Sequence, residues 1–211
     1  MKIGIIGAGH IGANAARLFV KAGHQVAICN SRGPESLDPL IEELGDNATA
    51  QLVDDVISFG DVIFISVPFG KYTELPVNGF DGKIVIDSNN YYPERDGAFP
   101  EIDEGKTTSS EMLERHLGGA RLVKGFNTIW YEHLKSQGDT ELPLEGRRAI
   151  FIAGDDSGAK EVVAKLIEEI GFAAVDTGFL KDGGRLQQPG SPIYNQELTA
   201  EAAAAVLSRT L

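Results

Sequence analysis

The chain has 211 residues, of which 42% are hydrophobic and 24% are charged, and its formal net charge is -12 at pH 7. This composition is typical of a globular protein, and the strong negative charge disfavours nucleic acid and anionic membranes as partners, because both would repel it. The single cysteine, Cys29, excludes a disulfide within the chain and suits a reducing, cytoplasmic location. No stretch approaches the ~18 consecutive apolar residues that a membrane span needs.

The chain opens with a predicted strand, Lys2–Ile6, that runs directly into a glycine-rich loop. The loop residues are Gly7, Ala8, Gly9, His10, Ile11 and Gly12. A helix is predicted after it, because apolar residues recur on one helical stripe up to the terminator Gly23. In this setting the first glycine permits a tight turn, the second lets backbone approach a pyrophosphate, and the third lets the helix pack closely. We therefore predict that these six residues form a dinucleotide site; the alternative is a glycine-rich turn without a ligand.

The second predicted strand, Gln25–Cys29, is followed by Asn30-Ser31-Arg32. NAD sites usually have an acidic residue here, about 20 positions after the glycine loop, which binds the adenosine ribose. No Asp or Glu occurs before Glu35. A carboxylate would repel a 2′-phosphate, whereas the Arg32 guanidinium can pair with one and the Ser31 hydroxyl can donate to it. These residues predict NADP as the cofactor; the alternative is that Arg32 is a solvated loop residue.

Strands and helices alternate along the rest of the chain. Further strands are predicted at Thr49–Leu52, Val62–Val67, Lys83–Asp87, Arg121–Lys124, Arg148–Ala153 and Ala173–Asp176, and further helices at Pro39–Leu44, Ser109–Leu117, Ser157–Ile170 and Thr199–Ser208. Apolar strands alternating with helices predict an α/β fold, a doubly wound, mostly parallel Rossmann sheet with a C-terminal α/β extension. We expect residues 1–211 to form a single NADP-binding domain, with a nucleotide-binding core to about residue 130 and the extension from about 131. Two loops, 89–106 and 178–198, are long enough to be functional.

Taken together, these motifs resemble the NADPH-dependent coenzyme F420 reductase family, also called F420-dependent NADP oxidoreductases. The chain is also similar to the cytosolic reductase domain of the six-transmembrane metalloreductases. The resemblance covers nearly the whole chain and rests on the order and spacing of several motifs. They are GAGHIG, NSR, SVPFGKY, DSNNYYP, LVKGFNTI and FIAGDDSGAKEVVAKLIEEIGF.

The resemblance implies further cofactor contacts and a homodimer. Besides the glycine loop, Ser31 and Arg32, the implied cofactor residues are Ser66, Val67, Pro68, Asn89 and Asn127. The two asparagines follow strands at their carboxyl ends, where ligands bind in such sheets. The alternative for each asparagine is that it caps a turn.

The residues that would contact the acceptor are predicted from the end of the sixth strand and from a later loop. Archaeal members of the family have a small, proline-containing segment after that strand, whereas this chain has Trp130 and Tyr131. Trp130 would fill the acceptor space or stack on a tricyclic ring; core packing is its alternative. The loop 187–195, with Pro192 and Tyr194, is expected to be a lid or a dimer contact.

The chain contains no conspicuous nucleophile, no Tyr-x-x-x-Lys pair and no zinc pattern, so we predict neither a catalytic residue nor a metal. Hydride transfer between two cofactor rings needs mainly proximity and orientation. We predict an NADP(H)-dependent oxidoreductase that transfers a hydride between NADPH and a small-molecule, flavin-like acceptor: coenzyme F420, FMN or FAD. The alternatives are an NADPH-dependent flavin or ferric reductase, a hydroxyacid or pyrroline-carboxylate type reductase, and a non-catalytic sensor of the NADP(H) redox ratio.

Overall fold

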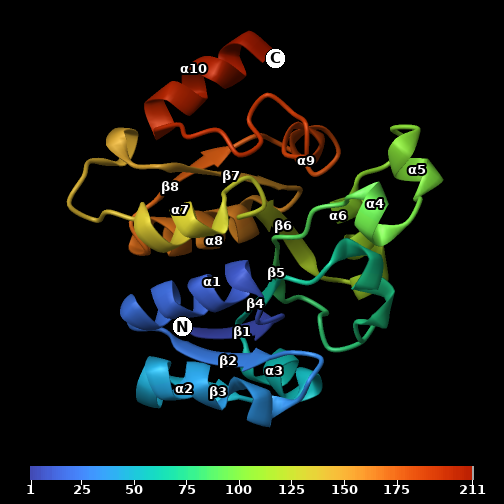
Figure 1. Ribbon diagram of the computed structural model, residues 1–211. Helices are drawn as coiled ribbons and strands as arrows, with labels where there is room; N and C mark the ends of the chain where they lie inside the picture. Colours follow the sequence, from blue (N-terminus) through green and yellow to red (C-terminus); the bar gives the residue numbers. More distant parts are fainter. Residues whose placement is uncertain (211) are drawn as a thin grey trace.

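The computed structural model describes residues 1–210 and contains one eight-stranded sheet with helices on both faces (Figure 1). The strands are β1 (Lys2–Ile6), β2 (Gln25–Cys29), β3 (Ala48–Ala50), β4 (Val62–Ile65), β5 (Ile84–Asp87), β6 (Arg121–Gly125), β7 (Ala149–Gly154) and β8 (Ala173–Asp176). Their order across the sheet is β3-β2-β1-β4-β5-β6-β7-β8. Strands β1 to β6 are parallel, β7 runs antiparallel to β6, and β8 is parallel to β7.

Ten α-helices and four 3₁₀ helices lie within the described residues. The α-helices are α1 (His10–Lys21), α2 (Asp38–Leu44), α3 (Val53–Phe59), α4 (Pro93–Asp96), α5 (Pro100–Asp103), α6 (Ser109–Leu117), α7 (Tyr131–Ser136), α8 (Ser157–Glu169), α9 (Asp182–Leu186) and α10 (Ala200–Thr210). The 3₁₀ helices are Pro34–Leu37, Gly45–Asn47, Phe69–Glu74 and Leu144–Gly146.

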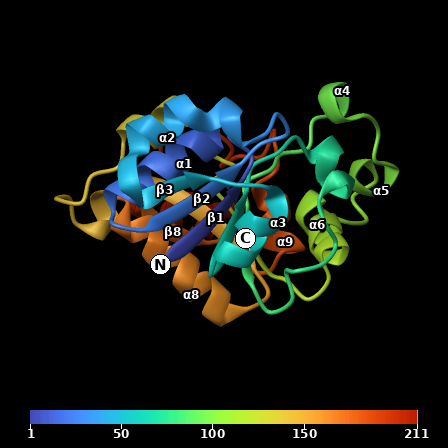
Figure 2. The ribbon, with the colours of Figure 1, turned by 90° about the horizontal axis from the view of Figure 1, so that it is seen from below.

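Alternate residues of the strands point to opposite faces of the sheet and pack there in separate cores. Ile3 and Ile5 of β1 pack with α1, α7 and α8, whereas Ile63 and Ile65 of β4 pack with α3 and α6 on the opposite face. Figure 2 shows α1 and α2 on one side of β1, β2 and β3, with α3 on the other. In both views α4 and α5 stand apart from the layered part of the molecule.

The predicted fold is confirmed: the sheet is doubly wound and mostly parallel, and β7 and β8 extend it. The boundaries differ by one or two residues at several strands. The changes are largest at β3, which spans Ala48–Ala50 rather than Thr49–Leu52, and at β4, which ends at Ile65 rather than Val67 because the chain turns out of the sheet toward Pro68. The short helices α3, α4, α5 and α9 were missed, since four to seven residues give too few turns for a clear helical period.

The strand order creates a switch point between β1 and β4. Chain connections leave β1 toward one side and β4 toward the other, so their carboxyl ends open a crevice where ligands bind in such sheets. The first residues beyond β1 and β4 are Gly7 and Ser66. The glycine loop therefore lies at the crevice that the topology favours for a ligand.

Candidate functional site

Two hollows lie along the carboxyl edge of the parallel strands and share the segment Ser66, Val67 and Pro68. The larger hollow, about 750 Å³, extends from the glycine loop to Ser31 and Arg32. The smaller hollow, about 380 Å³, is lined by His10 and Ile11 and by residues that follow β5 and β6. Together they bring most of the predicted site residues to one continuous edge.

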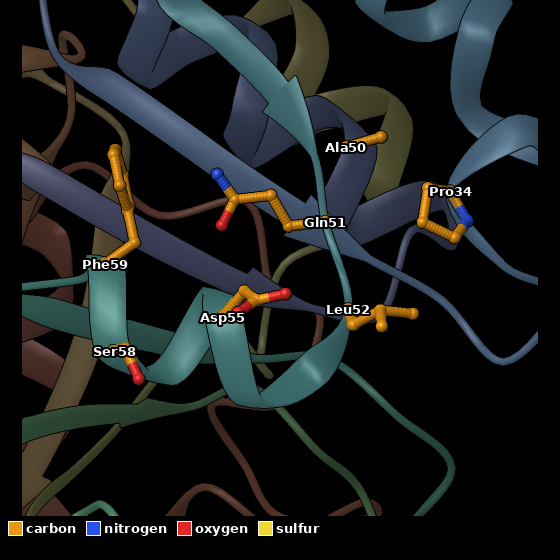
Figure 3. A pocket seen from close by; sticks show the side chains of 7 residues that line it. All are labelled: Pro34, Ala50, Gln51, Leu52, Asp55, Ser58 and Phe59. Atoms are coloured by element: carbon orange, nitrogen blue, oxygen red, sulfur yellow. The ribbon is translucent and has the colours of Figure 1, made fainter.

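A third hollow, about 630 Å³, lies between α3 and the residues that follow β3, and it shares no lining residue with the other two (Figure 3). Its lining residues are Pro34, Ala50, Gln51, Leu52, Asp55, Ser58 and Phe59. None of them is a predicted site residue, and the one charged group among them is the Asp55 carboxylate. The third hollow therefore lacks the cationic side chains that a phosphorylated ligand would need.

The three glycines of the loop have different structural requirements. Gly7 has a φ of +106°, and a Cβ there would lie 2.1 Å from the carbonyl oxygen of Ser66. A Cβ on Gly12 would lie 1.9 Å from the carbonyl oxygen of Gly7. A Cβ on Gly9, by contrast, would have no heavy atom of residues 1–210 within 4 Å. Packing thus requires glycine at positions 7 and 12, while at position 9 the missing side chain leaves open space beside the larger hollow.

The start of α1 suits an anion. Gly9 is the N-cap and its residue type offers no side chain to cap the helix, and the first turn contains no acidic residue. The first backbone N–H groups of the helix are therefore available, and the helix dipole adds positive potential at the same place. This geometry fits the pyrophosphate role that was predicted for the loop.

Ser31 and Arg32 lie exposed at the rim of the larger hollow. The Asn30 side chain shapes this turn, because its Oδ1 accepts the Arg32 N–H at 2.9 Å and its Nδ2 donates to Ser36 Oγ at 2.9 Å. Within the described residues, no hydrogen bond or ion pair involves the Arg32 guanidinium. The turn thus presents an unpaired cation at the end of the hollow, and its pairing with a 2′-phosphate remains a prediction.

Asn89 and Asn127 both line the smaller hollow, and both also bond within the protein. Asn89 Oδ1 accepts the Val67 N–H at 2.8 Å, which fixes the segment that the two hollows share. Asn127 Nδ2 donates to Asn90 Oδ1 at 3.1 Å and to the Gln187 carbonyl at 2.7 Å. Asn127 therefore links the end of β6 to neighbouring loops. This structural role resembles the turn cap that was the alternative to cofactor binding for this residue.

An aromatic wall, formed by His10, Tyr131 and Trp130, borders the smaller hollow. The rings of His10 and Tyr131 are stacked, with centroids 4.2 Å apart, and the Trp130 ring meets Tyr131 edge-on at 5.5 Å. The Asn14 side chain holds this wall against α1 by donating to the Tyr131 carbonyl at 2.8 Å. Trp130 is 49% exposed, so the interpretation of this residue as core packing is wrong.

The opposite side of the smaller hollow carries a group of polar side chains. The hydroxyls of Tyr92 and Tyr194 share a hydrogen bond, and Arg95 lies over the Tyr92 ring at 4.9 Å. Arg95 also donates to Asp96 at 2.8 Å and to the Asn90 carbonyl at 2.7 Å. Burial, together with the bond to Tyr92, raises the pKa of Tyr194, so this phenol keeps its proton at neutral pH. Sequence reasoning missed Tyr92 and Arg95, although Tyr92 lies within the DSNNYYP motif and Arg95 follows it by two residues.

The loop 187–195 is attached to the body of the protein at several points. Gln187 and Ile193 are buried, and Ile193 packs with β7 and α10. The Asn195 N–H donates to the Thr128 carbonyl at 3.1 Å. Tyr194 therefore lines the smaller hollow, and its contact with an acceptor stays a prediction, whereas Pro192 is exposed and is not among the residues that line either hollow.

Comparison with known proteins gives consistent relatives. Residues 2–91 match the family model described as "NADP oxidoreductase coenzyme F420-dependent". The solved structure of a hypothetical protein from Sinorhizobium meliloti is 34% identical, with a TM-score of 0.80 over 94% of this chain and 95% of that one. A proposed F420-dependent NADP reductase from Arthrobacter sp. FB24 shares the fold at 23% identity, with a TM-score of 0.72 over 88% of this chain and 89% of that one.

A curated relative is the rat metalloreductase STEAP3, which is 28% identical over 181 residues, 85% of this chain and 34% of the relative. The chain thus spans about a third of the length of the curated relatives it matches. Among residues 1–210, none of the helices combines the length and apolar character that crossing a bilayer requires.

Proposed function

We propose that this chain, which belongs to the coenzyme F420-dependent NADP oxidoreductase family, transfers a hydride between NADPH and a flavin-like acceptor, coenzyme F420 or a flavin. One observation carries the proposal: two hollows meet at Ser66–Pro68, one ending at an unpaired guanidinium and the other at an aromatic wall. A dinucleotide and a planar ring system are the two ligands that such a pair of hollows would suit.

The residues of the larger hollow fit NADPH. The open space at Gly9 and the uncapped start of α1 would receive the pyrophosphate, and Arg32 with Ser31 would bind the 2′-phosphate. Ser66, Val67 and Pro68 would then lie along the nicotinamide half, because they line both hollows. When bound, NADPH supplies the hydride, and the chain supplies binding and orientation.

The residues of the smaller hollow fit a planar acceptor. Trp130 and Tyr131 offer ring faces and edges for stacking, and the hydroxyls of Tyr92 and Tyr194 offer hydrogen bonds to polar ring atoms. No covalent step is needed, which agrees with the state of the single thiol. Burial raises the pKa of Cys29 to about 11, so this side chain is a poor nucleophile at neutral pH.

A second candidate is NADPH-dependent reduction of a free flavin or of a ferric chelate, and the likeness to the metalloreductases favours it. Both candidates use the same NADPH site. In the second, NADPH would pass its hydride to the flavin, and the reduced flavin would pass one electron to each of two ferric ions, because ferric iron accepts one electron and a hydride carries two. The resemblance also favours a homodimer, which light scattering after size-exclusion chromatography would test.

The test begins with binding and continues with single-turnover transfer. Calorimetric titrations should show tighter binding of NADPH than of NADH. Rapid mixing of the NADPH complex with F420, FMN or FAD should then oxidise the nicotinamide, which is followed by its absorbance. Tight NADPH binding without transfer to any of these acceptors or to ferric citrate would refute the oxidoreductase proposal and favour the sensor alternative.

A further inference from the structure

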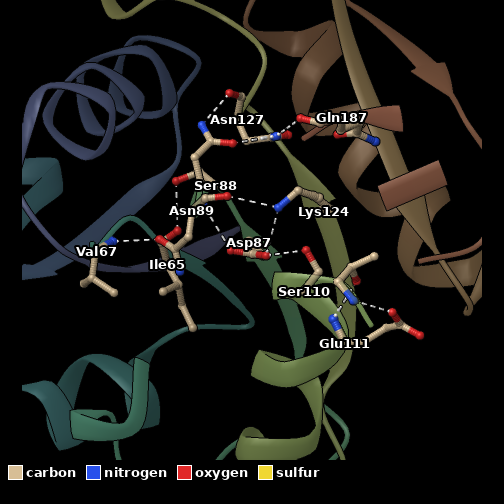
Figure 4. Close-up of polar contacts among 12 residues, drawn as sticks. Ile65, Val67, Asp87, Ser88, Asn89, Ser110, Glu111, Lys124, Asn127 and Gln187 are labelled. Atoms are coloured by element: carbon tan, nitrogen blue, oxygen red, sulfur yellow. Dashed lines mark hydrogen bonds and ion pairs between the residues drawn. The ribbon is translucent and has the colours of Figure 1, made fainter. Parts of the chain in front are cut away.

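A charged pair is buried beneath the smaller hollow, at the carboxyl ends of β5 and β6 (Figure 4). The side chains of Asp87 and Lys124 are each 1% exposed, and the sheet register pairs the two residues directly. Lys124 Nζ lies 3.3 Å from Asp87 Oδ2, and the Ser110 hydroxyl donates to the same oxygen at 2.6 Å. The pair therefore belongs to a compact polar cluster inside an apolar sheet.

Such a pair is not an efficient way to stabilise a fold. Removing both charges from water is costly, and apolar residues of similar size often stabilise a core as well or better. The neighbouring strand positions Ile86 and Val123 are apolar and fully buried, so the sheet has no general need for charge here. The polar contacts of the cluster indicate what the two charges do.

The cluster holds Asn89 at both of its backbone polar groups. The Asn89 N–H donates to Asp87 Oδ1 at 2.9 Å, and the Asn89 carbonyl accepts from Lys124 Nζ at 3.0 Å. At the side chain, Oδ1 accepts the Val67 N–H at 2.8 Å. Three of the four polar groups of Asn89 are thus paired, two of them by the buried charges.

The fourth group, Asn89 Nδ2, is buried and has no hydrogen-bond partner among residues 1–210. The amide cannot turn over to pair it, because the Val67 N–H needs an acceptor and the amide nitrogen is a donor. Asn89 lines the smaller hollow beside the segment that both hollows share. A buried donor without a partner at this place indicates that an acceptor atom of a bound ligand forms the missing hydrogen bond with Asn89 Nδ2.

We propose that Asp87 and Lys124 are positioning residues for the dinucleotide. They fix the Asn89 backbone so that Oδ1 braces Val67 and Nδ2 donates to an acceptor oxygen on the nicotinamide half of the bound cofactor. The inference rests on the proposed function, since it assumes that NADP(H) occupies the shared edge. The new element is that binding of the nicotinamide half of the cofactor depends on a buried ion pair that does not itself contact the ligand. Binding of the adenosine half does not depend on this pair.

The test compares two ligands on two variants. NADPH contains both halves, whereas adenosine 2′,5′-bisphosphate contains the adenosine half alone. Lys124→Met removes the bond to the Asn89 carbonyl but leaves the Asp87 carboxylate buried without a counter-charge. The double variant Asp87→Asn/Lys124→Met also removes that negative charge, retains an oxygen for the Asn89 N–H, and is the variant designed to stay folded. Lys160→Met is the matched control, because it breaks another lysine–aspartate pair, Lys160–Asp176 at 2.7 Å, away from both hollows.

Calorimetric titration of the double variant should show NADPH binding weakened at least about tenfold, equivalent to about 1.4 kcal/mol. Binding of the bisphosphate should stay within about twofold of the unaltered protein, and Lys160→Met should change neither affinity. Equal weakening of both ligands would reduce the pair to a structural role and overturn the proposal, as would unchanged NADPH binding. If the unaltered protein binds NADPH but transfers no hydride, the proposed function fails while the two affinities still decide this inference.

Discussion

Replacing Gly9 by alanine should separate cofactor binding from folding. The added methyl group would have no heavy atom of the described chain within 4 Å, and the backbone, with φ −74° and ψ −170°, is open to any residue. Alanine also lowers the conformational entropy of the unfolded chain. We therefore expect Gly9→Ala to raise the free energy of unfolding slightly, by less than about 1 kcal/mol.

The same methyl group should weaken NADPH binding strongly. Gly9 lines the larger hollow at the start of α1, so the methyl group occupies space that the pyrophosphate would need. A displaced pyrophosphate loses hydrogen bonds to the backbone, and a bond to a charged group contributes about 1.5–3 kcal/mol. Losing one such bond corresponds to about 10- to 150-fold weaker binding.

Calorimetry with NADPH and thermal unfolding, measured on the same preparations, check both halves of this prediction. Gly12→Ala is the control, because its methyl group would lie 1.9 Å from the Gly7 carbonyl oxygen and must destabilise the fold. The reasoning is refuted if Gly9→Ala binds NADPH like the unaltered protein. A fall in Tm as large as that of Gly12→Ala would refute it equally.

Three further substitutions test other parts of the site. Arg32→Ala should weaken NADPH binding by about 10- to 150-fold and leave NADH binding unchanged, because only the 2′-phosphate would lose a charged partner; equal titration losses for both would contradict this. Trp130→Ala should raise the KM for a flavin or F420 about 2- to 10-fold through lost stacking, with little change in Tm because the ring is 49% exposed; an unchanged KM would remove Trp130 from the acceptor site. Folded Cys29 has a pKa of about 11 against an ordinary 9.0, so the unfolded thiol ionises first and the free energy of unfolding should fall between these pH values, by up to about 3 kcal/mol. Denaturant titrations at each pH should show that this part of the fall is absent in Cys29→Ala, and an identical slope in both proteins would contradict it.

Much of the fold could be predicted from the sequence because the strands are short, apolar and separated by clear turn residues. Gln25–Cys29 and Ala173–Asp176 were predicted with their observed bounds, and Ser109–Leu117 coincides with α6. The bounds of α7 could not be predicted in the same way, since six residues cannot establish a helical period. The stacking of Tyr131 on His10 could not be predicted either, because it depends on how that helix lies against α1.

The site was partly predictable for a related reason. Local motifs identify the glycine loop and Arg32, because each acts where it stands in the chain. The role of Lys124 depends on its partner across the sheet, and register cannot be derived from one strand alone. The sequence nonetheless contained a signal. Lys124 ends a predicted buried strand directly after Leu122 and Val123, and a buried lysine needs a partner of opposite charge. Asp87 ends another apolar strand and could have been identified as that partner.

The two hollows draw on different stretches of the chain and overlap only at Ser66, Val67 and Pro68. Loops after β1 and β2 shape one, while the segments after β5 and β6 and the late residue Tyr194 shape the other. Mutations in the segments after β5 and β6 can therefore reshape the smaller hollow without disturbing the far end of the larger one, at Ser31 and Arg32. Under the proposed function, substitutions in these segments would change the redox acceptor while the nucleotide preference set at Arg32 is inherited unchanged. For protein engineering, the segment just after β6 is therefore a place where residues could be exchanged to change the smaller hollow.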